Sequence, residues 1–199
     1  MRDFPIKFEE TKDILMYPAI QDKIRADILE IGPGRGDLLF SLAVENPSKK
    51  FVAIEMMHSR YEKLVENTER RALKNIQLIR ADARVALKRY FEPETFEKIY
   101  VLFPDPWPKN KHAFRRLLSV EWITLLVNLL KTGGELICAT DVASYADWVF
   151  ANLKTFPNLQ NKLEPHKYLN EIEGLTETYF QKKWKALGLN LHFMTHTKI

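Results

Sequence analysis

The sequence contains a single cysteine, Cys138, among its 199 residues. A disulfide bond within the chain is therefore excluded. Because no Cys and His residues have the spacing of a zinc site, we expect no bound metal. Cys138 stands in the apolar run Leu136-Ile137-Cys138-Ala139. Free cysteine is among the residue types most often buried, so this pattern indicates a small core residue.

Long apolar runs are missing as well. No stretch approaches the roughly 18 residues of a membrane-spanning helix, and residues 1–10 alternate charged with apolar side chains without a signal-peptide core. We therefore expect a cytoplasmic protein with no membrane partner. Hydrophobic residues make up 46% and charged residues 28%, a balance typical of a folded globular protein, and the length suits one domain spanning 1–199.

The excess of positive charge is small, with 30 Lys and Arg against 26 Asp and Glu, giving a net charge of +4. An excess of this size agrees with a polyanionic partner but does not require one. The places where the cations cluster are therefore more informative than their number.

Strand-like apolar runs alternate with helix-like amphipathic runs along the chain. This alternation predicts an α/β fold, with a parallel sheet covered by helices on both faces. In such sheets ligands bind beyond the carboxyl ends of the strands, where the strand order reverses. The predicted strands are 26–31, 51–55, 76–80, 98–103, 135–140 and 190–195, and the predicted helices are 37–45, 59–73, 84–90, 116–130 (closed by Gly133-Gly134), 143–153 and 178–187.

A glycine-rich turn follows the first strand, with Gly32, Gly34 and Gly36 at alternate positions. Glycines so spaced allow a tight turn and a close backbone approach to a ligand. A dinucleotide fingerprint has its third glycine one position later, where this chain has Asp37, and an aspartate at a helix start opposes pyrophosphate binding. S-adenosylmethionine carries an ammonium and a sulfonium but no phosphate, so the acidic turn favours it. A plain tight turn is the alternative.

Two more carboxylates follow the next two strands. Glu55 ends the second strand, where a carboxylate can accept hydrogen bonds from both ribose hydroxyls, or is a solvated loop residue. Asp82 follows the third strand and can accept from the adenine amine, or cap the helix that begins near Arg84. With Glu30 at the end of the first strand, these carboxylates together favour a cofactor site more strongly than any one alone.

A proline-rich loop, FPDPWPK, follows the fourth strand at 103–109. Three prolines in five residues predict a stiff, preset loop that holds Asp105 still, which suits a group aligned against a reacting atom. The next residues, 109–116, contain four cations and His112, and can grip phosphates beside the site. A structural proline turn and a solvated charge run are the respective alternatives.

The glycine-rich turn, the 103–109 loop, His112 and Arg115-Arg116 together resemble the bacterial tRNA (guanine-N7)-methyltransferases, over nearly the whole chain. The resemblance implies a Rossmann-like class I methyltransferase fold with a mostly parallel, seven-stranded sheet. It also implies S-adenosylmethionine as cofactor, tRNA as partner, and methylation of N7 of guanosine 46 in the variable loop by a monomer or homodimer.

The resemblance also assigns roles to individual residues. The family's late Thr-x-aromatic-Glu motif appears here as Thr178-Tyr179-Phe180-Gln181, so an amide replaces the family's carboxylate. The implied cofactor-binding residues are Glu30, Gly32, Gly34, Gly36, Glu55, Asp82 and Asp105; the catalytic residue is Asp105; the substrate-binding residues are Lys109, Asp141, Thr178 and Gln181; and the RNA-binding residues are Lys111, His112, Arg115 and Arg116.

The implied chemistry needs little beyond alignment. Guanine N7 already has an in-plane lone pair, so no strong base is required, and alignment can supply on the order of 7–11 kcal/mol. Asp105 is the candidate that orients the base, with Asp141 either helping or capping the next helix.

Three other functions remain as alternatives. A methyltransferase for a small molecule or a protein leaves the basic segment unexplained. A non-catalytic RNA-binding subunit agrees with Gln181 but not with the presence of Glu55 and Asp105. Asp37 disfavours a nicotinamide dehydrogenase.

Overall fold

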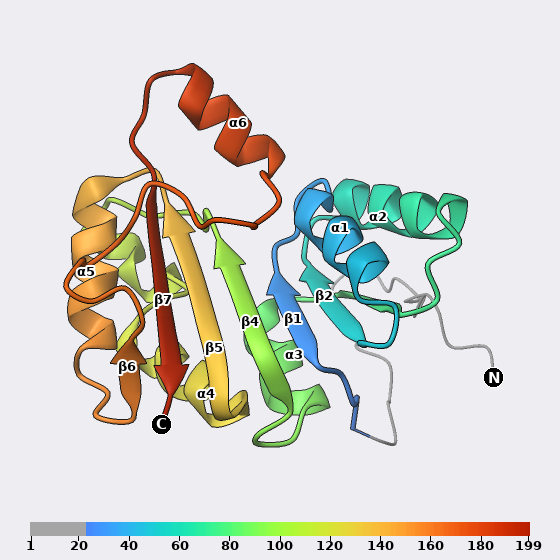
Figure 1. The fold of residues 1–199 in the computed structure, drawn as a ribbon, viewed down its shortest axis with the longest axis horizontal. Coiled ribbons are helices and arrows are strands. Elements are labelled where there is room, and N and C mark those ends of the chain that lie inside the picture. Colours follow the sequence, from blue (N-terminus) through green and yellow to red (C-terminus); the bar gives the residue numbers. More distant parts are fainter. Residues whose placement is uncertain (1–22) are drawn as a thin grey trace.

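Residues 23–199, which the computed structural model describes, form one sheet in the order β3-β2-β1-β4-β5-β7-β6 (Figure 1). Strands β1 to β5 pair in parallel, β7 is antiparallel to β5, and β6 is antiparallel to β7. The predicted α/β fold with a mostly parallel, seven-stranded sheet is confirmed. The strands are β1 (Ile28–Ile31), β2 (Phe51–Glu55), β3 (Ile76–Arg80), β4 (Phe96–Leu102), β5 (Leu130–Thr140), β6 (Leu159–Asn161) and β7 (His192–Lys198).

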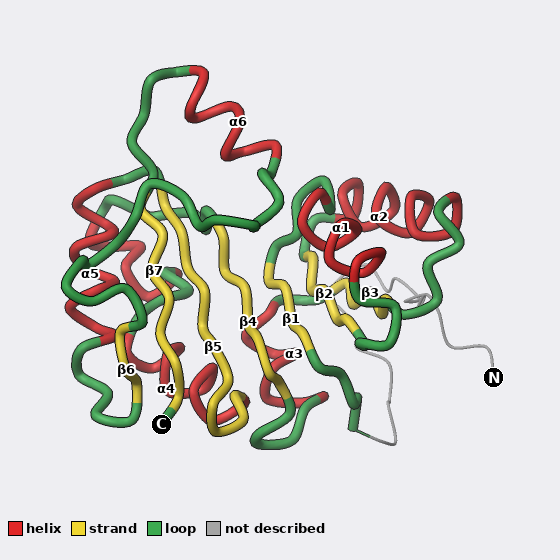
Figure 2. Tube along the Cα trace, viewed as in Figure 1, coloured by secondary structure: helices red, strands yellow, loops and turns green. Residues whose placement is uncertain are grey.

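Helices cover both faces of the sheet, as predicted (Figure 2). Buried side chains of α1 and α2 pack on one face, and those of α3, α4 and α5 pack on the other. Helix α6 lies beyond the carboxyl ends of the parallel strands, above the sheet in Figure 1. The helices are α1 (Asp37–Glu45), α2 (His58–Arg70), α3 (Ala83–Tyr90), α4 (Val120–Leu129), α5 (Ala143–Leu153) and α6 (Tyr179–Ala186), with a 3-10 helix at Asn110–Arg115.

The central strands are apolar because both of their faces are covered. Every residue of β1 and β2 is buried, and Leu29, Phe51 and Ile79 are almost completely inaccessible. Burial of one such side chain contributes about 1.5–3 kcal/mol. Cys138 on β5 is also buried, as its apolar run predicts. The packed core therefore fixes the strand ends from which the functional loops leave.

The strand order reverses between β1 and β4. The chain passes from β1 outward to β2 and β3, then returns to place β4 on the other side of β1. The loops after β1 and β4 consequently leave the sheet in different directions, and ligands of α/β proteins bind at such a reversal. These two loops are the glycine-rich turn and the loop that contains Asp105.

The predicted helix 116–130 is wrong at both ends. Helix α4 begins at Val120, after the N-cap residue Ser119, because the preceding residues form a 3-10 helix and a turn. The glycine pair does not end the helix. It lies inside β5, where the register with β4 shifts, and Gly133 has φ 80. A Cβ at Gly134 would lie 2.9 Å from the Lys131 carbonyl oxygen, so the glycines permit a bulge.

The last strands also differ from the prediction. β7 runs from His192 to Lys198, longer than the predicted 190–195, and the three-residue edge strand β6 is not predicted. Residues 1–10, considered above for a targeting signal, lie outside the described residues. None of the helices within 23–199 combines the length and apolar content needed to span a membrane, and no group of three or more potential ligands there could hold a metal ion.

Candidate functional site

The turn after β1 requires glycine. Gly32, Gly34 and Gly36 all have positive φ, a left-handed conformation that other residues adopt at a cost. Gly36 is also the N-cap of α1, and a Cβ there would lie 2.5 Å from the Phe40 ring. The Gly36 N–H donates to the Pro33 carbonyl at 2.8 Å and closes the turn. The predicted tight turn is confirmed, with its backbone at the carboxyl edge of the sheet.

Glu30, at the end of β1, is buried beneath this turn. Its Oε2 atom has no hydrogen-bond partner among residues 23–199. Burial raises the pKa of Glu30 to about 8, and the negative charge of Asp37 raises it further in the same direction. The carboxyl group is therefore mostly protonated at neutral pH, and a nearby cationic ligand would favour its ionised form.

Glu55, at the end of the neighbouring strand β2, has a second unsatisfied oxygen. Its Oε1 accepts a hydrogen bond from the Met57 N–H at 2.8 Å, whereas Oε2 is buried without a partner in the described part of the chain. An unsatisfied buried acceptor costs about 1–3 kcal/mol. Two of them on adjacent strands indicate a place where a ligand supplies the missing donors.

Asp82 adopts the capping role that was the alternative to cofactor binding. Its Oδ1 accepts from the Arg84 N–H at 2.8 Å, at the start of α3. The Arg84 guanidinium also donates to both oxygens, at 2.6 to 3.0 Å. Burial raises the pKa of Asp82, but the hydrogen bonds from Arg84 outweigh this effect, and the pKa is lowered overall. Asp82 is thus ionised, with both oxygens engaged.

The loop that carries Asp105 is strained and braced. Phe103 and Trp107 have φ 52 and 42, a left-handed conformation that costs a non-glycine residue roughly 1–3 kcal/mol. The Phe103 N–H donates to the Ala139 carbonyl at 2.8 Å, and its ring packs edge-on against Phe193 of β7. Asp105 lies between these two strained residues and is exposed. Its carboxylate is consequently presented to solvent by a fixed backbone.

The two adjacent arginines of the basic segment have different environments. Arg116 is half-buried and donates to the carbonyl oxygens of Pro106 and Trp107, at 3.0 to 3.2 Å. Arg115 is exposed, with its guanidinium 4.9 Å from the centre of the Trp107 ring. His112 packs against the other ring neighbour of this segment, 5.6 Å from Trp107. Lys109 and Lys111 are exposed.

The late Thr178–Gln181 motif forms a capping box at the start of α6. The Gln181 N–H donates to Thr178 Oγ1 at 3.2 Å, and Gln181 Oε1 accepts from the Thr178 N–H at 3.4 Å. A glutamine serves in a capping box as a glutamate does, because both provide the acceptor oxygen. The amide at this position therefore preserves the local geometry, and Gln181 is buried.

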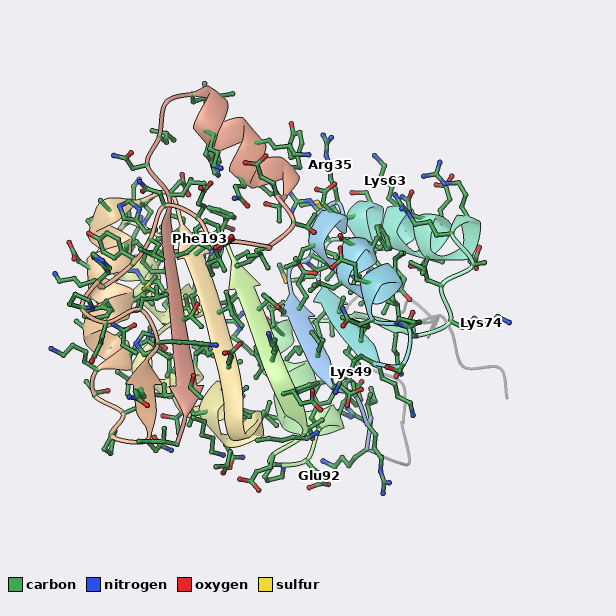
Figure 3. All side chains as sticks on the ribbon, viewed as in Figure 1. Arg35, Lys49, Lys63, Lys74, Glu92 and Phe193 are labelled. Atoms are coloured by element: carbon green, nitrogen blue, oxygen red, sulfur yellow. The ribbon has the colours of Figure 1, made fainter. Side chains whose placement is uncertain are left out.

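Helix α6 begins on top of the glycine-rich turn. The Tyr179 N–H donates to Asp37 Oδ2 at 2.8 Å, and the Arg35 guanidinium lies 3.4 Å from the centre of the Tyr179 ring. A Cβ at Gly34 would contact the Phe180 ring at 3.4 Å. Figure 3 shows Arg35 on the edge of the molecule that faces α6. Sequence analysis did not assign a role to Arg35 or Tyr179, and the only signal was the aspartate that follows the glycines.

Asp141 follows β5 and does not cap α5. The N-cap of α5 is Val142, with no side-chain hydrogen bond, so the capping alternative for Asp141 is wrong. Asp141 is half-buried, and β5 is the parallel neighbour of β4. The loops that carry Asp105 and Asp141 therefore leave the sheet side by side.

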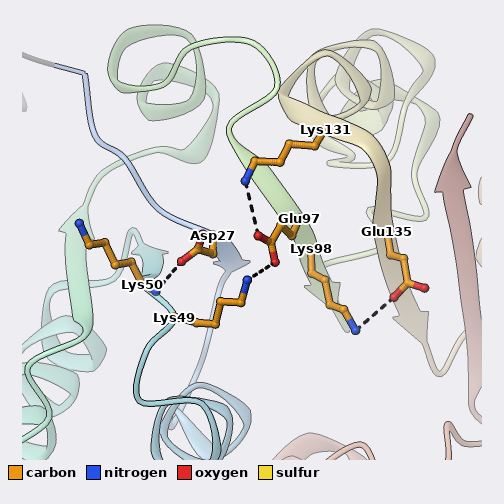
Figure 4. Close-up of polar contacts among 7 residues, drawn as sticks. All are labelled: Asp27, Lys49, Lys50, Glu97, Lys98, Lys131 and Glu135. Carbon is orange, nitrogen blue, oxygen red and sulfur yellow. Dashed lines mark hydrogen bonds and ion pairs between the residues drawn. The ribbon is translucent and has the colours of Figure 1, made fainter.

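Charges at the opposite, amino edge of the parallel strands are paired with one another (Figure 4). Glu97 contacts Lys49 at 2.6 Å and Lys131 at 3.5 Å, and Glu135 contacts Lys98 at 3.2 Å. The hydrogen bond from Lys49 lowers the pKa of Glu97, although partial burial opposes it. The unsatisfied carboxylates and the basic segment at the carboxyl edge thus contrast with a neutralised amino edge.

Comparison with known proteins gives a consistent set of relatives. Residues 25–194 match the methyltransferase family model Methyltransf_4. The tRNA (guanine-N(7)-)-methyltransferase of Syntrophotalea carbinolica is 32% identical over 171 residues, which cover 86% of this chain and 73% of that protein. The enzyme of the same name from Nitrosomonas europaea is 33% identical over 188 residues, covering 94% and 83% respectively.

Solved structures with low sequence identity share the fold. The 16S rRNA methyltransferase KamB superposes with a TM-score of 0.63 at 19% identity, covering 89% of both chains. An antibiotic-related methyltransferase superposes with a TM-score of 0.61 at 14% identity, covering 87% of this chain and 88% of the other. Both comparisons agree with the class I methyltransferase fold implied by the sequence motifs.

Proposed function

Because the chain belongs to the bacterial tRNA (guanine-N7)-methyltransferase family, we propose that it methylates N7 of a guanosine in tRNA, using S-adenosylmethionine. Guanosine 46 of the variable loop is the proposed position. The observation that carries this proposal is the meeting of two unsatisfied buried carboxylates and the braced Asp105 loop at one edge of the sheet.

The residues after β1 and β2 fit the proposed cofactor. Glu30 would accept from its ammonium group and Glu55 from its ribose hydroxyls, since each has a buried oxygen without a donor among residues 23–199. Gly32, Gly34 and Gly36 allow the backbone to approach it. When bound, S-adenosylmethionine supplies an electrophilic methyl group on a sulfonium. Asp105 would complete the site, whereas a contact from Asp82 to adenine requires Arg84 to release an oxygen.

Asp105 is the proposed catalytic residue. A carboxylate can accept hydrogen bonds from the N1–H and the amino group of guanine, and it stabilises the positive charge that develops on the base. No proton has to leave N7, so the chief requirement is alignment. The strained backbone on both sides of Asp105 supports this role because it fixes the direction of the carboxylate. Asp141, on the neighbouring loop, and Lys109 would contact the substrate.

The remaining predicted residues divide into two groups. Thr178 and Gln181 bond to one another in the capping box, so we propose that they act on the substrate by fixing the start of α6 beside the glycine-rich turn. Lys111, His112 and Arg115 lie on the segment that follows the Asp105 loop and would contact RNA phosphates.

Methyl transfer to an unmodified tRNA transcript tests the proposal. We expect 7-methylguanosine among the product nucleosides, identified by mass spectrometry, and no incorporation into a transcript with adenosine at position 46. Undiminished incorporation into that transcript would assign the reaction to another nucleotide. Failure of the folded protein to methylate any tRNA would contradict the proposed activity.

The matched variants Asp105→Ala and Asp105→Asn test the mechanism. We expect both to lower kcat by at least about 100-fold, since alignment and charge stabilisation each contribute several kcal/mol to catalysis. Affinity for S-adenosylmethionine, measured separately, distinguishes loss of the cofactor contact from loss of base orientation. Equal rates for the variants and the wild type would remove Asp105 from the mechanism.

A further inference from the structure

Arg116 faces the Asp105 loop and not the solvent. Its Nε–H donates to the Pro106 carbonyl at 3.1 Å and to the Trp107 carbonyl at 3.2 Å, and its Nη2 donates to the Trp107 carbonyl at 3.0 Å. Both acceptors lie just after Asp105, and Trp107 is one of the two strained residues. A planar guanidinium can hold two carbonyl groups in a fixed relative position, which an ammonium group cannot do equally well.

The same guanidinium also contacts α5. It lies 4.9 Å from the centre of the Trp148 ring, and Trp148 in turn stacks on Tyr145 with an interplanar angle of 17°. Helix α5 begins two residues after Asp141. Arg116 therefore touches both the loop after β4 and the helix that follows the loop after β5, so it joins the elements that carry the two carboxylates of the proposed site.

We propose that Arg116 is a positioning residue, which holds the Asp105 loop in its strained conformation and aligns Asp105 with the guanine. This inference rests on the proposed function and replaces the RNA-binding role that the sequence resemblance implies for Arg116. The backbone acceptors already occupy the Nε and Nη2 donors, and the residue is half-buried. Arg115, by contrast, is exposed and remains in the RNA-binding role.

Paired substitutions at the two arginines separate positioning from phosphate contact. A lysine retains the charge and binds phosphate as a point charge, but it cannot reproduce the fork that holds two carbonyls. We therefore compare Arg116→Lys and Arg116→Ala with Arg115→Lys and Arg115→Ala. The measurements are kcat, KM for tRNA, the salt dependence of tRNA affinity, and affinity for S-adenosylmethionine, all below the thermal midpoint of every variant.

For Arg116→Lys we expect kcat to fall at least about 10-fold, because small misplacements of aligned groups cost that much or more. KM for tRNA and the salt slope should stay within about twofold of the wild type, since the charge is kept. Arg115→Lys should keep kcat, and Arg115→Ala should lower tRNA affinity. Added guanidinium at low millimolar concentration should restore part of the kcat of Arg116→Ala but not change that of Arg115→Ala.

Two results would overturn the inference. One is wild-type kcat in Arg116→Lys. The other is a loss of tRNA affinity in Arg116→Ala with unchanged kcat at saturating tRNA, which is the behaviour of a phosphate contact. An inactive wild-type protein would instead contradict the proposed function, so the two failures are distinguishable.

Discussion

Glu30 is a buried carboxyl group that lies beside another acid and has a pKa of about 8. In the unfolded chain its pKa is near 4.5, so between these values the folded state holds a proton that the unfolded state has lost. Its contribution therefore makes the protein without ligand less stable as pH rises from 4.5 to 8. A neutral amide of the same shape lacks this dependence.

Glu30→Gln should accordingly stabilise the ligand-free protein more at pH 8 than at pH 5, by on the order of a few kcal/mol. Thermal unfolding of wild type and variant at the two pH values measures the difference. An equal change of the thermal midpoint at both pH values would show that the carboxyl group ionises as easily in the folded chain as in the unfolded one.

The same pKa predicts how cofactor affinity depends on pH. If Glu30 accepts from the ammonium group of S-adenosylmethionine, the carboxyl group must lose its proton on binding, so affinity should rise by up to about tenfold per pH unit between pH 6 and 8. Titration calorimetry in buffers of different ionisation enthalpy measures the released proton. Glu30→Gln is the control and should bind weakly with no such pH dependence; a pH-independent wild-type Kd contradicts the prediction.

At the scale of elements, α6 is attached to the glycine-rich turn mainly through Asp37. This carboxylate accepts from the Tyr179 N–H, and a second hydrogen bond joins Thr176 to Ser41 of α1 at 2.7 Å. Because few other contacts hold the start of α6, its docking should respond to the loss of one acceptor.

Asp37→Ala should lower the hydrogen-exchange protection of 178–182 and reduce kcat, since the capping box would no longer be held beside the cofactor site. Asp37→Asn is the matched control. It keeps an acceptor for Tyr179 but removes the charge, so it should retain the protection while shifting the pKa of Glu30 downward. Wild-type protection in Asp37→Ala would mean that α6 docks independently of this bond.

Elements with strong periodicity or clear end signals could be predicted from the sequence. The bounds of β2, β3, α1 and α5 agree with the prediction, because apolar runs and helical spacing are local properties. The start of α4 could not be predicted in this way, since the residues before it are fixed by contacts to a distant loop. Likewise, Gly133-Gly134 occurs at a helix end or in a strand bulge, and only the pairing with β4 decides between them.

The site was predictable to the same extent. Carboxylates and glycines at strand ends follow from the α/β pattern, which places those ends at one edge. The bond between Asp37 and Tyr179 spans 142 positions, and the inward direction of Arg116 depends on Trp148, so neither is visible in local sequence. Alternating Arg115 and Arg116 between two functions is likewise a property of the folded loop alone.

For the whole molecule, the distribution of charge matters more than its sum of +4. At the amino edge of the strands the cations Lys49, Lys98 and Lys131 are neutralised by Glu97 and Glu135. At the carboxyl edge, Lys109, Lys111 and Arg115 are exposed and form no ion pair within residues 23–199. A polyanion is therefore attracted to the edge where the proposed site lies, even though the molecule as a whole is only mildly basic.

This asymmetry predicts which cations contribute to the salt dependence of tRNA binding. Each phosphate contact that is removed should reduce the slope of log Kd against log salt by about 1. Lys111→Ala and Arg115→Ala should each do so, whereas Lys49→Ala and Lys131→Ala, which change the net charge equally, should leave the slope unchanged. Filter binding over a range of salt concentrations measures the slopes. Equal reductions for all four variants would mean that tRNA responds to total charge, and the carboxyl edge would then lose its claim to be the RNA-binding face.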